Sequence, residues 1–420
     1  MKPTLISLLL TGTLLAGPAL AVDKAEVVKT YADIAAAAFG DSATTAQALQ
    51  TAVAALVAQP SDDTLAAARA AWRAARVPYL QTEVFRFGNP VVDDWEGRVN
   101  SWPLDEGLID YVDANAYGGP SEENPLSTLN VIATPKFRIG ATEVDATTIT
   151  ADTIRSLHEA DGIEANVASG YHAVEFLLWG QDLNGTGPGA GARPYTDFVQ
   201  GAGCTGGNCD RRAAYLTAAT DLLVRDLQEM AGNWAEGGAA RAAVVTDPAK
   251  GVRTMLIGMG SLSYGELAGE RMKLGLMLND PEEEQDCFSD NTQNSHYYDG
   301  LGIRNVYLGS YARPDGKVVS GPSLSELVAA GDPAVNTQLT AELEDSVAKL
   351  GALKQAADGG FAYDQMLAPG DKRGEKLIMD AVDALVTQTA SIQRAVAVVD
   401  GSKVEFEGSD SLDNPDAVFQ

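Results

Sequence analysis

The clearest pattern in this chain is the stretch EKLIMDAVDALVTQTASIQRAVAV at residues 375–398. Its apolar side chains recur at helical spacing, so they would gather on one side of an α-helix. A helix with an apolar stripe must bury that stripe against another element. The stretch therefore predicts a long amphipathic helix packed inside a helical domain. The stripe consists of Leu377, Ala381, Ala384, Leu385 and Ile392.

Similar helical patterns cover most of the remaining chain, and the N-terminal ones are rich in alanine. Pro78 is expected to kink the helix in which it lies, because proline removes a backbone hydrogen bond. Trp102 and Pro103 are expected to open a short helix, because proline is favoured at the first helical position. The longer helices are expected at 24–39, 42–58, 62–87, 163–179, 211–234, 252–278 and 336–356.

These helices predict a mainly α fold of two four-helix-bundle-like domains. A Gly-rich segment at 185–208 is the expected junction between them. The N-terminal domain is then expected at 22–184 and the C-terminal domain at 209–400. The acidic end, 401–420, is expected to be a solvated tail.

A small β excursion is expected within the first domain. The helical period is lost there, and residues 130–133, 137–141 and 147–150 have the composition of short strands.

Composition narrows the classes of partner. The chain has 420 residues, of which 45% are hydrophobic, so it can form a packed core and is not intrinsically disordered. Its formal charge is −28, and a sequence pI near 4.3 excludes the cationic surface that nucleic-acid binding requires. The acidic surface that this charge implies attracts cations, including metal ions.

The N-terminal 21 residues predict a secretory signal peptide. They carry one charge, at Lys2, followed by an apolar run that ends in Ala19-Leu20-Ala21, an Ala-x-Ala cleavage site. Because no cysteine follows that site, we expect a periplasmic product without a lipid anchor. No later stretch approaches the ~18 apolar residues of a membrane span, so no transmembrane segment is expected in the mature chain.

The three cysteines allow three pairings, and the sequence alone does not choose among them. Cys204 and Cys209 enclose a flexible Thr-Gly-Gly-Asn stretch, so we favour their disulfide and expect Cys287 to be reduced and buried. A thiolate metal site would lack a fourth ligand and the CxxC spacing of structural zinc.

The most informative histidine lies in the sequence GYHAVE at residues 170–175. His172 and Glu175 are three residues apart, so a helix would direct both side chains toward one ion, iron or zinc. The alternative is that these two side chains simply hydrogen-bond to each other where helices pack.

Further ligands would have to come from distant segments. Glu83, and Asp105 or its neighbour Glu106, are acidic residues beside aromatic and otherwise apolar sequence, where a charge needs a partner. For each of them the alternative is a salt bridge to an arginine. The candidate arginines are Arg76, Arg86 and Arg193.

Several blocks of this sequence resemble the imelysin family, which includes insulin-cleaving membrane protease and iron-regulated protein A. The GxHxxE motif at 170–175 is the core of the resemblance, and the similar blocks together span most of the mature chain. These blocks are WRAARVPYLQTEVFRF at 72–87, WPLDEGLIDY at 102–111, FLLWGQD at 176–182, RPYTD at 193–197 and DCFSDNTQNSHYYDGLGIRNVYLG at 286–309.

The resemblance implies an exported protein of two helical domains that takes part in iron uptake and binds metal through HxxE with nearby acidic side chains. His172 and Glu175 match the motif itself, whereas Glu83 and Asp105 match by position only. Residues near 260–272 are expected to form the opposite wall of a cleft, with a salt-bridged helix surface as the alternative. The cleft candidates are Arg193, Glu266, Glu270 and Arg271.

The family also implies a metal-dependent peptidase, but this sequence lacks a complete catalytic motif. Neither HExxH nor HxxEH is present, so a second histidine ligand would have to be His158 or His296, brought from a distance. We interpret His158 as a surface residue and His296 as part of a polar loop. Ser261 and Ser263 do not satisfy GxSxG.

Three functions therefore remain as hypotheses. The first is capture or delivery of a metal ion, iron or alternatively zinc, at His172, Glu175, Glu83 and Asp105, with an outer- or inner-membrane iron-transport component as partner; carboxylate-rich ligation suits Fe³⁺. The second is a zinc-type peptidase in which Glu175 or Glu83 activates water. The third is a module that binds a peptide, polysaccharide or protein without a metal.

Overall fold

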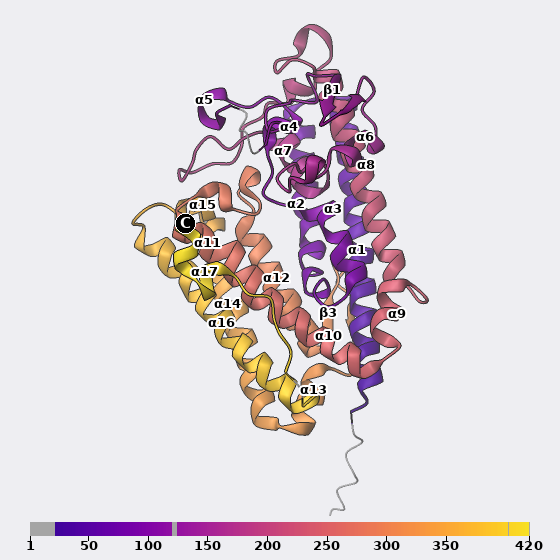
Figure 1. Cartoon of the computed structure of the whole chain (residues 1–420), viewed down its shortest axis with the longest axis vertical. Helices are drawn as coiled ribbons and strands as arrows, with labels where there is room; N and C mark the ends of the chain where they lie inside the picture. The colour runs from indigo at the N-terminus through magenta and orange to yellow at the C-terminus, as the bar shows by residue number, and fades with distance from the viewer. Residues whose placement is uncertain (1–21, 120–123, 402, 420) are drawn as a thin grey trace, which may run out of the picture.

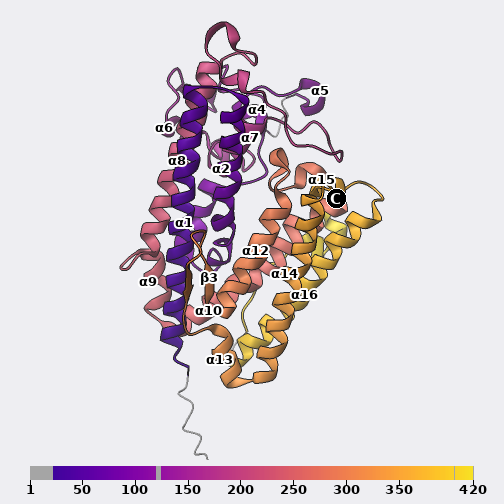
Figure 2. The same cartoon turned by 180° about the vertical axis from the view of Figure 1, so that it is seen from behind.

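Two helical bundles lean against each other in the computed structural model, which describes residues 22–119, 124–401 and 403–419 (Figures 1 and 2). The predicted signal peptide, residues 1–21, lies outside the described residues. The fold is mainly α, as predicted, with two small antiparallel sheets in the described residues.

The first bundle is built around the long helix α1 (Lys24–Ala58), which packs along α2 (Asp62–Leu80) and α8 (Cys209–Trp234). Two helices were expected where α1 runs unbroken. The expected break between residues 39 and 42 does not occur, because the buried face of the helix continues through it, with Ala38 and Phe39 buried before it and Ser42 after it. Pro78 lies inside α2, which ends two residues later. The shorter helices α3 (Pro90–Asn100) and α7 (Gly170–Trp179) complete this bundle.

Helix α8 corrects the predicted domain division. The boundary at 185–208 would place residues 209–234 in the second domain, but α8 packs against α1 and α7 (Figure 1). Its apolar face, which includes Leu216, Leu223 and Leu227, is buried in the first bundle. The Gly-rich segment therefore connects two parts of the first bundle. The chain passes to the second bundle only afterwards, through α9 (Ala239–Val245) and α10 (Pro248–Ser261).

The second bundle contains α12 (Thr292–Leu308), α14 (Pro333–Asp358) and α16 (Lys372–Val399) together with the π-helix η5 (Leu262–Lys273) that continues α10. The stripe predicted in residues 375–398 is largely confirmed in α16, where Ala381, Leu385 and Ile392 are fully buried. Helix α12 was not predicted, because it is buried on several sides and shows little amphipathic pattern. It lies between α2 and α14.

The β excursion is a hairpin of β1 (Lys136–Ile139) and β2 (Thr142–Asp145), in which Phe137 pairs with Val144. The strands expected at 130–133 and 147–150 are absent, because these residues form a turn and the approach to α6 (Ala151–Leu157). A second hairpin, β3 (Ser310–Ala312) with β4 (Val318–Ser320), was not predicted; it lies on α1.

Short helices and turns connect these elements. The expected helix start at Trp102-Pro103 is instead a loop, and helix begins only at Glu106. The remaining elements are α4 (Glu106–Ile109), α5 (Ala114–Tyr117), α11 (Leu274–Leu278), α13 (Leu324–Gly331), α15 (Tyr363–Met366), α17 (Asp410–Asp413), η1 (Glu83–Phe85), η2 (Ala160–Gly162), η3 (Tyr195–Phe198), η4 (Gly201–Gly203), η6 (Pro281–Glu283), η7 (Cys287–Ser289) and η8 (Pro415–Phe419).

The C-terminal segment is not the solvated tail that its acidic composition predicted. Ser411 is fully buried and donates a hydrogen bond from Oγ to the carbonyl of Gly269, and Tyr264 donates one to Asp413. The segment lies along the end of α10 and along η5, because Gly260 of α10 and Gly269 of η5 leave room for it; a Cβ at Gly260 would lie 2.4 Å from the Phe406 ring. Glycines of α10 and η5 thus allow the acidic C-terminal segment to pack closely, through the segment's own backbone and a few of its apolar side chains.

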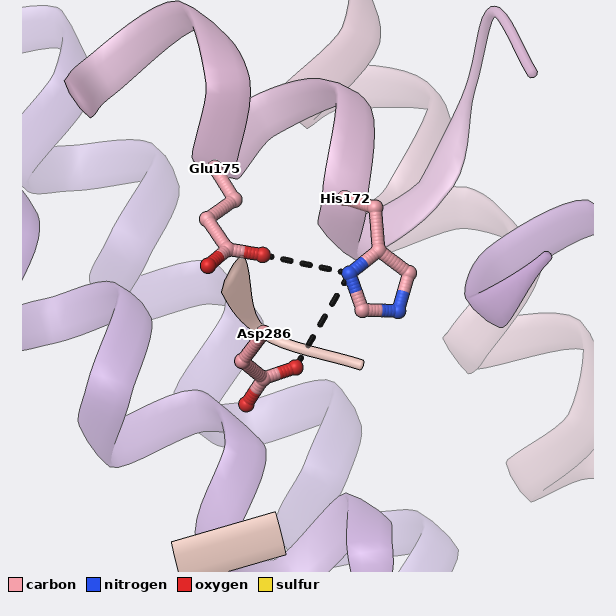
Figure 3. A group of neighbouring side chains, drawn as sticks. All are labelled: His172, Glu175 and Asp286. Atoms are coloured by element: carbon pink, nitrogen blue, oxygen red, sulfur yellow. Dashed lines mark hydrogen bonds and ion pairs between the residues drawn. The ribbon is translucent and has the colours of Figure 1, made fainter. Parts of the chain in front are cut away.

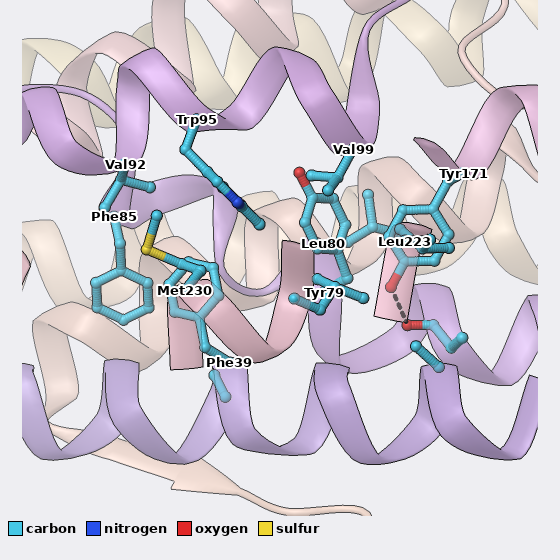
Figure 4. Packing of buried hydrophobic residues seen from close by; sticks show 14 of the residues in the cluster. Phe39, Tyr79, Leu80, Phe85, Val92, Trp95, Val99, Tyr171, Leu223 and Met230 are labelled. Carbon is cyan, nitrogen blue, oxygen red and sulfur yellow. Dashed lines mark hydrogen bonds between the residues drawn. The ribbon is translucent and has the colours of Figure 1, made fainter. Parts of the chain in front are cut away.

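Aromatic side chains fill the centre of the first bundle (Figure 4). Phe39 stacks on Trp234 with ring centroids 6.3 Å apart and meets Trp95 edge-on at 5.9 Å. Such pairs contribute about 0.5–1.5 kcal/mol each beyond the burial of their area. This core holds α3 and α8 against α1, and α7 packs on both α3 and α8.

Cys204 and Cys209 form a disulfide, and Cys287 is free and partly buried. Within the part of the chain that the structure describes, no helix is both long enough and apolar enough to cross a membrane.

Candidate metal centre

Helix α7 carries the GxHxxE motif, and all ten of its residues are buried. Gly170 begins the helix with φ +86°, and a Cβ at this position would lie 2.5 Å from the Val99 carbonyl of α3. Only glycine combines that backbone angle with so close an approach. The motif therefore begins with glycine because α7 must start directly against α3.

His172 and Glu175 lie on one face of α7, as the sequence predicted, and Asp286 approaches them from the loop before η7 (Figure 3). The Nδ1 atom of His172 is 3.1 Å from Glu175 Oε2 and 3.8 Å from Asp286 Oδ1. Among the described residues, this trio is the one group of three or more histidine, cysteine, aspartate or glutamate side chains whose potential ligand atoms all lie within 4.8 Å of one another. All three side chains are at most 1% exposed.

Arg76 from α2 is the counterion of this group. Its guanidinium lies 2.7 Å from Asp286 Oδ1 and donates a second hydrogen bond to Asn100 Oδ1 at 2.6 Å. It also lies over the rings of Tyr79 and Tyr171. A fixed positive charge therefore balances one of the two carboxylates.

Backbone and side-chain donors orient the two carboxylates. Ser289 donates its backbone N–H to Glu175 Oε1 at 3.0 Å, and Asn291 donates its side-chain amide to Asp286 Oδ2 at 2.7 Å. The Ser295 hydroxyl also donates to Asp286 Oδ2. These contacts leave Glu175 Oε2 and Asp286 Oδ1 facing the imidazole. Hydrogen bonds of this kind fix the geometry of metal ligands.

Burial and charge set the protonation of the group. Burial and the nearby Arg76 lower the pKa of His172 to about 3, so the imidazole is neutral at pH 7 and its nitrogen can bind a metal. Burial and the charge of Asp286 raise the pKa of Glu175 well above its usual range. The pKa of Asp286 is lowered, because Arg76 and its hydrogen bonds outweigh its burial. A proton held by Glu175 would be released when a cation binds.

The donor chemistry of these residues fits a metal ion. One imidazole nitrogen and two carboxylate oxygens form a donor set that suits Fe²⁺ and Zn²⁺. The nitrogen that faces both carboxylates is Nδ1, and the other ring nitrogen, Nε2, points away from them and is buried without a hydrogen-bond partner in the described structure.

Glu83 does not join this centre, contrary to the prediction. It lies on η1 and pairs with Arg271 of η5 at 2.7 Å, and Arg271 also contacts Glu266 at 2.8 Å and Asp299 at 3.0 Å. The alternative expected for Glu83, a salt bridge, is the one found, although its partner is Arg271. Two cleft candidates, Glu266 and Arg271, thus belong to a buried ionic network between the bundles. Glu270 is exposed.

Asp105 also lies apart from His172. Tyr117 donates its hydroxyl to Asp105 at 3.1 Å, and Asn124 donates its side-chain amide to it as well. Asp105 lines a cavity of about 890 Å³ with Glu106 and three further carboxylates. Cys287 and Phe288, which directly follow Asp286, form part of the same wall. The other carboxylates are Asp113, Asp182 and Glu282.

Arg193, the fourth cleft candidate, is buried and pairs with Asp110 at 2.8 Å and Asp197 at 3.0 Å. His158, interpreted as a surface residue, is mostly buried, and its Nε2 lies 2.9 Å from the Gly97 carbonyl. His296, expected in a polar loop, is fully buried in α12. Neither histidine forms part of the trio around His172.

Asp286 is the residue of the candidate centre that the sequence argument missed, and Arg76 was considered only as a salt-bridge partner of Glu83, Asp105 or Glu106. Asp286 is the first residue of the block 286–309 and Arg76 lies in the block 72–87, and both blocks had marked the resemblance. That similarity was a signal, but it did not say which polar residue would face His172.

The fold and the site define a class of protein: two packed helical bundles with a buried group of one histidine and two carboxylates that suits a metal ion. A family model described as Imelysin matches residues 35–392. The chain belongs to the imelysin family.

Two relatives agree with this assignment. Iron-regulated protein A of Synechococcus elongatus is 25% identical over 377 residues, which cover 88% of this chain and 82% of the relative. A crystal structure of a protein assigned as an iron-regulated protein A precursor, from Parabacteroides distasonis, superposes with a TM-score of 0.65 and 19% identity. It covers 91% of this chain and 97% of the other, and it shows that the fold is shared.

Proposed function

We propose that this chain is an exported protein that binds iron at His172, Glu175 and Asp286 and takes part in iron capture or delivery, with zinc as the alternative metal. The observation that carries the proposal is the convergence of three buried ligand atoms, all within 4.8 Å of one another, from α7 and a distant loop. The name of the relative, iron-regulated protein A, supports iron.

Charge balance favours a divalent ion. Two ionised carboxylates and Arg76 give the centre a net charge of about −1 when His172 is neutral, so Fe²⁺ leaves less uncompensated buried charge than Fe³⁺ does. This modifies the expectation of a ferric ion, which was based on carboxylate ligands alone. Because the proton on Glu175 must leave, the affinity is expected to rise with pH.

The acidic cavity beside Cys287 and Phe288 supports an approach route for cations. Its carboxylates would raise the local cation concentration next to the loop that carries Asp286. Export rests on the apolar N-terminus at 1–21, and a membrane iron-transport component is the proposed recipient of the ion.

Calorimetry on chelator-stripped protein tests this assignment with Fe²⁺ and Zn²⁺. We expect His172→Ala and Asp286→Asn each to lower the affinity at least ~10-fold, because each removes one ligand. Asp105→Asn is the matched control, since this carboxylate was a sequence candidate but lies outside the trio, and it should leave the affinity nearly unchanged.

Equal effects of Asp105→Asn and Asp286→Asn would contradict the assignment. Chelator-sensitive hydrolysis of an unfolded protein, abolished by Glu175→Gln, would support the peptidase hypothesis instead.

A further inference from the structure

The acidic cavity beside Cys287 and Phe288 is large enough to hold a small molecule. Its volume of about 890 Å³ lies within the range of small-molecule sites. Its walls include the loop before α4, helix α5, the loop after α7, and η6. Helix α5 projects from the first bundle on the side of the second bundle (Figures 1 and 2). Among the described residues these walls hold five carboxylates and no lysine or arginine. The carboxylates are Asp105, Glu106, Asp113, Asp182 and Glu282.

Glu106 is a wall residue whose charge has no counterion. Its side chain is 6% exposed, and within the described residues it forms no salt bridge with lysine or arginine, in contrast to Glu83 with Arg271. Burial and the charge of Glu282, another wall residue, raise the pKa of Glu106 to about 8. An ionised carboxylate in a buried place is costly without a cation, so a positively charged ligand in the cavity would relieve this cost.

The spacing of the five carboxylates does not favour a single metal ion. In the part of the chain that the structure describes, only the trio at His172 brings three potential ligand side chains within 4.8 Å of one another. Two of the five also have local partners: Asp105 accepts a hydrogen bond from Tyr117, and Asp113 accepts hydrogen bonds from the backbone of α5. The negative charge is therefore spread around the cavity and suits a ligand whose positive charges are also spread.

Aromatic and apolar side chains share these walls. Trp102, Tyr117 and Phe288 line the cavity, and aromatic rings attract ammonium groups through their faces. Leu183 lines it as well and is 60% exposed, so it is free to contact the carbon chain of a ligand. The combination of separated carboxylates with aromatic and aliphatic surface favours an organic cation over a hydrated inorganic one.

We propose that this cavity binds an aliphatic polyamine, an extended organic cation whose ammonium groups are separated by short carbon chains. Its ammonium groups pair with Glu106 and Glu282, and its carbon chain lies against Leu183 and the aromatic rings. Each ammonium group carries several N–H donors and no acceptor, which matches carboxylates that lack a cation. The site requires no metal at His172, so it does not depend on the function proposed above.

Calorimetry with spermidine on chelator-stripped full-length protein tests this assignment. It is performed at pH 8, near the pKa of Glu106, and at an ionic strength of about 0.15 M, which screens diffuse attraction to the acidic surface. We expect saturable binding by the wild type. The double variant Glu106→Gln with Glu282→Gln should lower the affinity at least ~10-fold, because it removes two anionic partners.

Trp102→Leu should lower the affinity for spermidine several-fold although the charge of the cavity is unchanged. Thermal unfolding without spermidine verifies that each variant folds. The matched control removes two exposed carboxylates outside the cavity, Asp94→Asn with Glu236→Gln, and should keep the full affinity. His172→Ala should keep it too, which separates this result from the test of the metal centre.

Three outcomes would overturn the proposal. The first is the absence of saturable spermidine binding by the wild type. The second is an unchanged affinity in the Glu106–Glu282 double variant, or displacement of spermidine by an equal concentration of Mg²⁺, because either would indicate only diffuse attraction to an acidic surface. The third is loss of spermidine binding in His172→Ala, because the amine would then bind through the first centre.

Discussion

Glu106 shows how a single buried carboxylate makes stability depend on pH. It is 6% exposed, and burial together with the charge of Glu282 raises its pKa to about 8. The folded protein therefore keeps a proton that the unfolded chain loses above pH ~4.5, and this contribution to stability is lost as pH rises toward 8.

Glu106→Gln, which mimics the protonated acid, should accordingly stabilise the metal-free protein at pH 8 but hardly at pH 5. The difference should grow by up to about 1.4 kcal/mol per pH unit in that window. Urea denaturation at both pH values measures it, and Glu164→Gln, an exposed glutamate, serves as the control. An equal effect of Glu106→Gln at both pH values would show that Glu106 is ionised in the folded state.

At the residue scale the sequence identified His172 and Glu175 because both lie on one helix, where a spacing of three residues is sufficient to place them together. Asp286 was not identified, and Arg76 was considered only for other carboxylates, because their approach to His172 depends on how separate segments pack. Glu83 was assigned to the wrong group for the same reason: its neighbour Arg271 is distant in sequence.

Among the elements, α1 provides a test of helix propensity. Gly40 lies in the middle of this helix, and nothing lies within 4 Å of the position of an added Cβ. Gly40→Ala should therefore raise the free energy of unfolding by about 0.5–1 kcal/mol, because alanine loses less backbone entropy on folding.

Gly251→Ala in α10 is the contrasting substitution. Its Cβ would lie 2.5 Å from the Val244 carbonyl, so this variant should lower the free energy of unfolding. Urea denaturation of both variants distinguishes intrinsic propensity from packing. Destabilisation by Gly40→Ala would mean that α1 is interrupted near residue 40, as the sequence had suggested.

The π-helix η5 owes its contact with the C-terminal segment to glycine. A Cβ at Gly265 would lie 2.6 Å from the Glu407 carbonyl, so Gly265→Ala should displace residues 403–413 while leaving the helical content nearly unchanged. Limited proteolysis, read as new cleavage beyond residue 400, checks this. Gly232→Ala, at an open position of α8, should produce no new cleavage.

For the whole molecule, Arg271 is a buried ionic connection between the bundles. It is 4% exposed and faces Glu83 of the first bundle as well as Glu266 and Asp299 of the second. Arg271→Ala would leave several buried carboxylates without their cation and should lower stability by roughly 3–5 kcal/mol.

Arg304→Ala removes a partly exposed partner of Glu344 within the second bundle and should cost at most about 1 kcal/mol. Thermal or urea unfolding compares the two variants. Similar small effects would mean that apolar packing alone holds the bundles together.

Local periodicity was sufficient to predict the helical class, the stripe of α16 and the pairing of His172 with Glu175, because all of these depend on residues a few positions apart. It did not predict α12, because several of its buried side chains are polar, among them Gln293, His296 and Asp299, so no apolar stripe is visible in its sequence. Three further features depend on contacts between residues tens to hundreds of positions apart. They are the packing of α8 in the first bundle, the packing of the C-terminal segment on η5, and the position of Asp286 and Arg76 beside His172. Such contacts are selected by the shape and charge of surfaces that exist only once the bundles have packed.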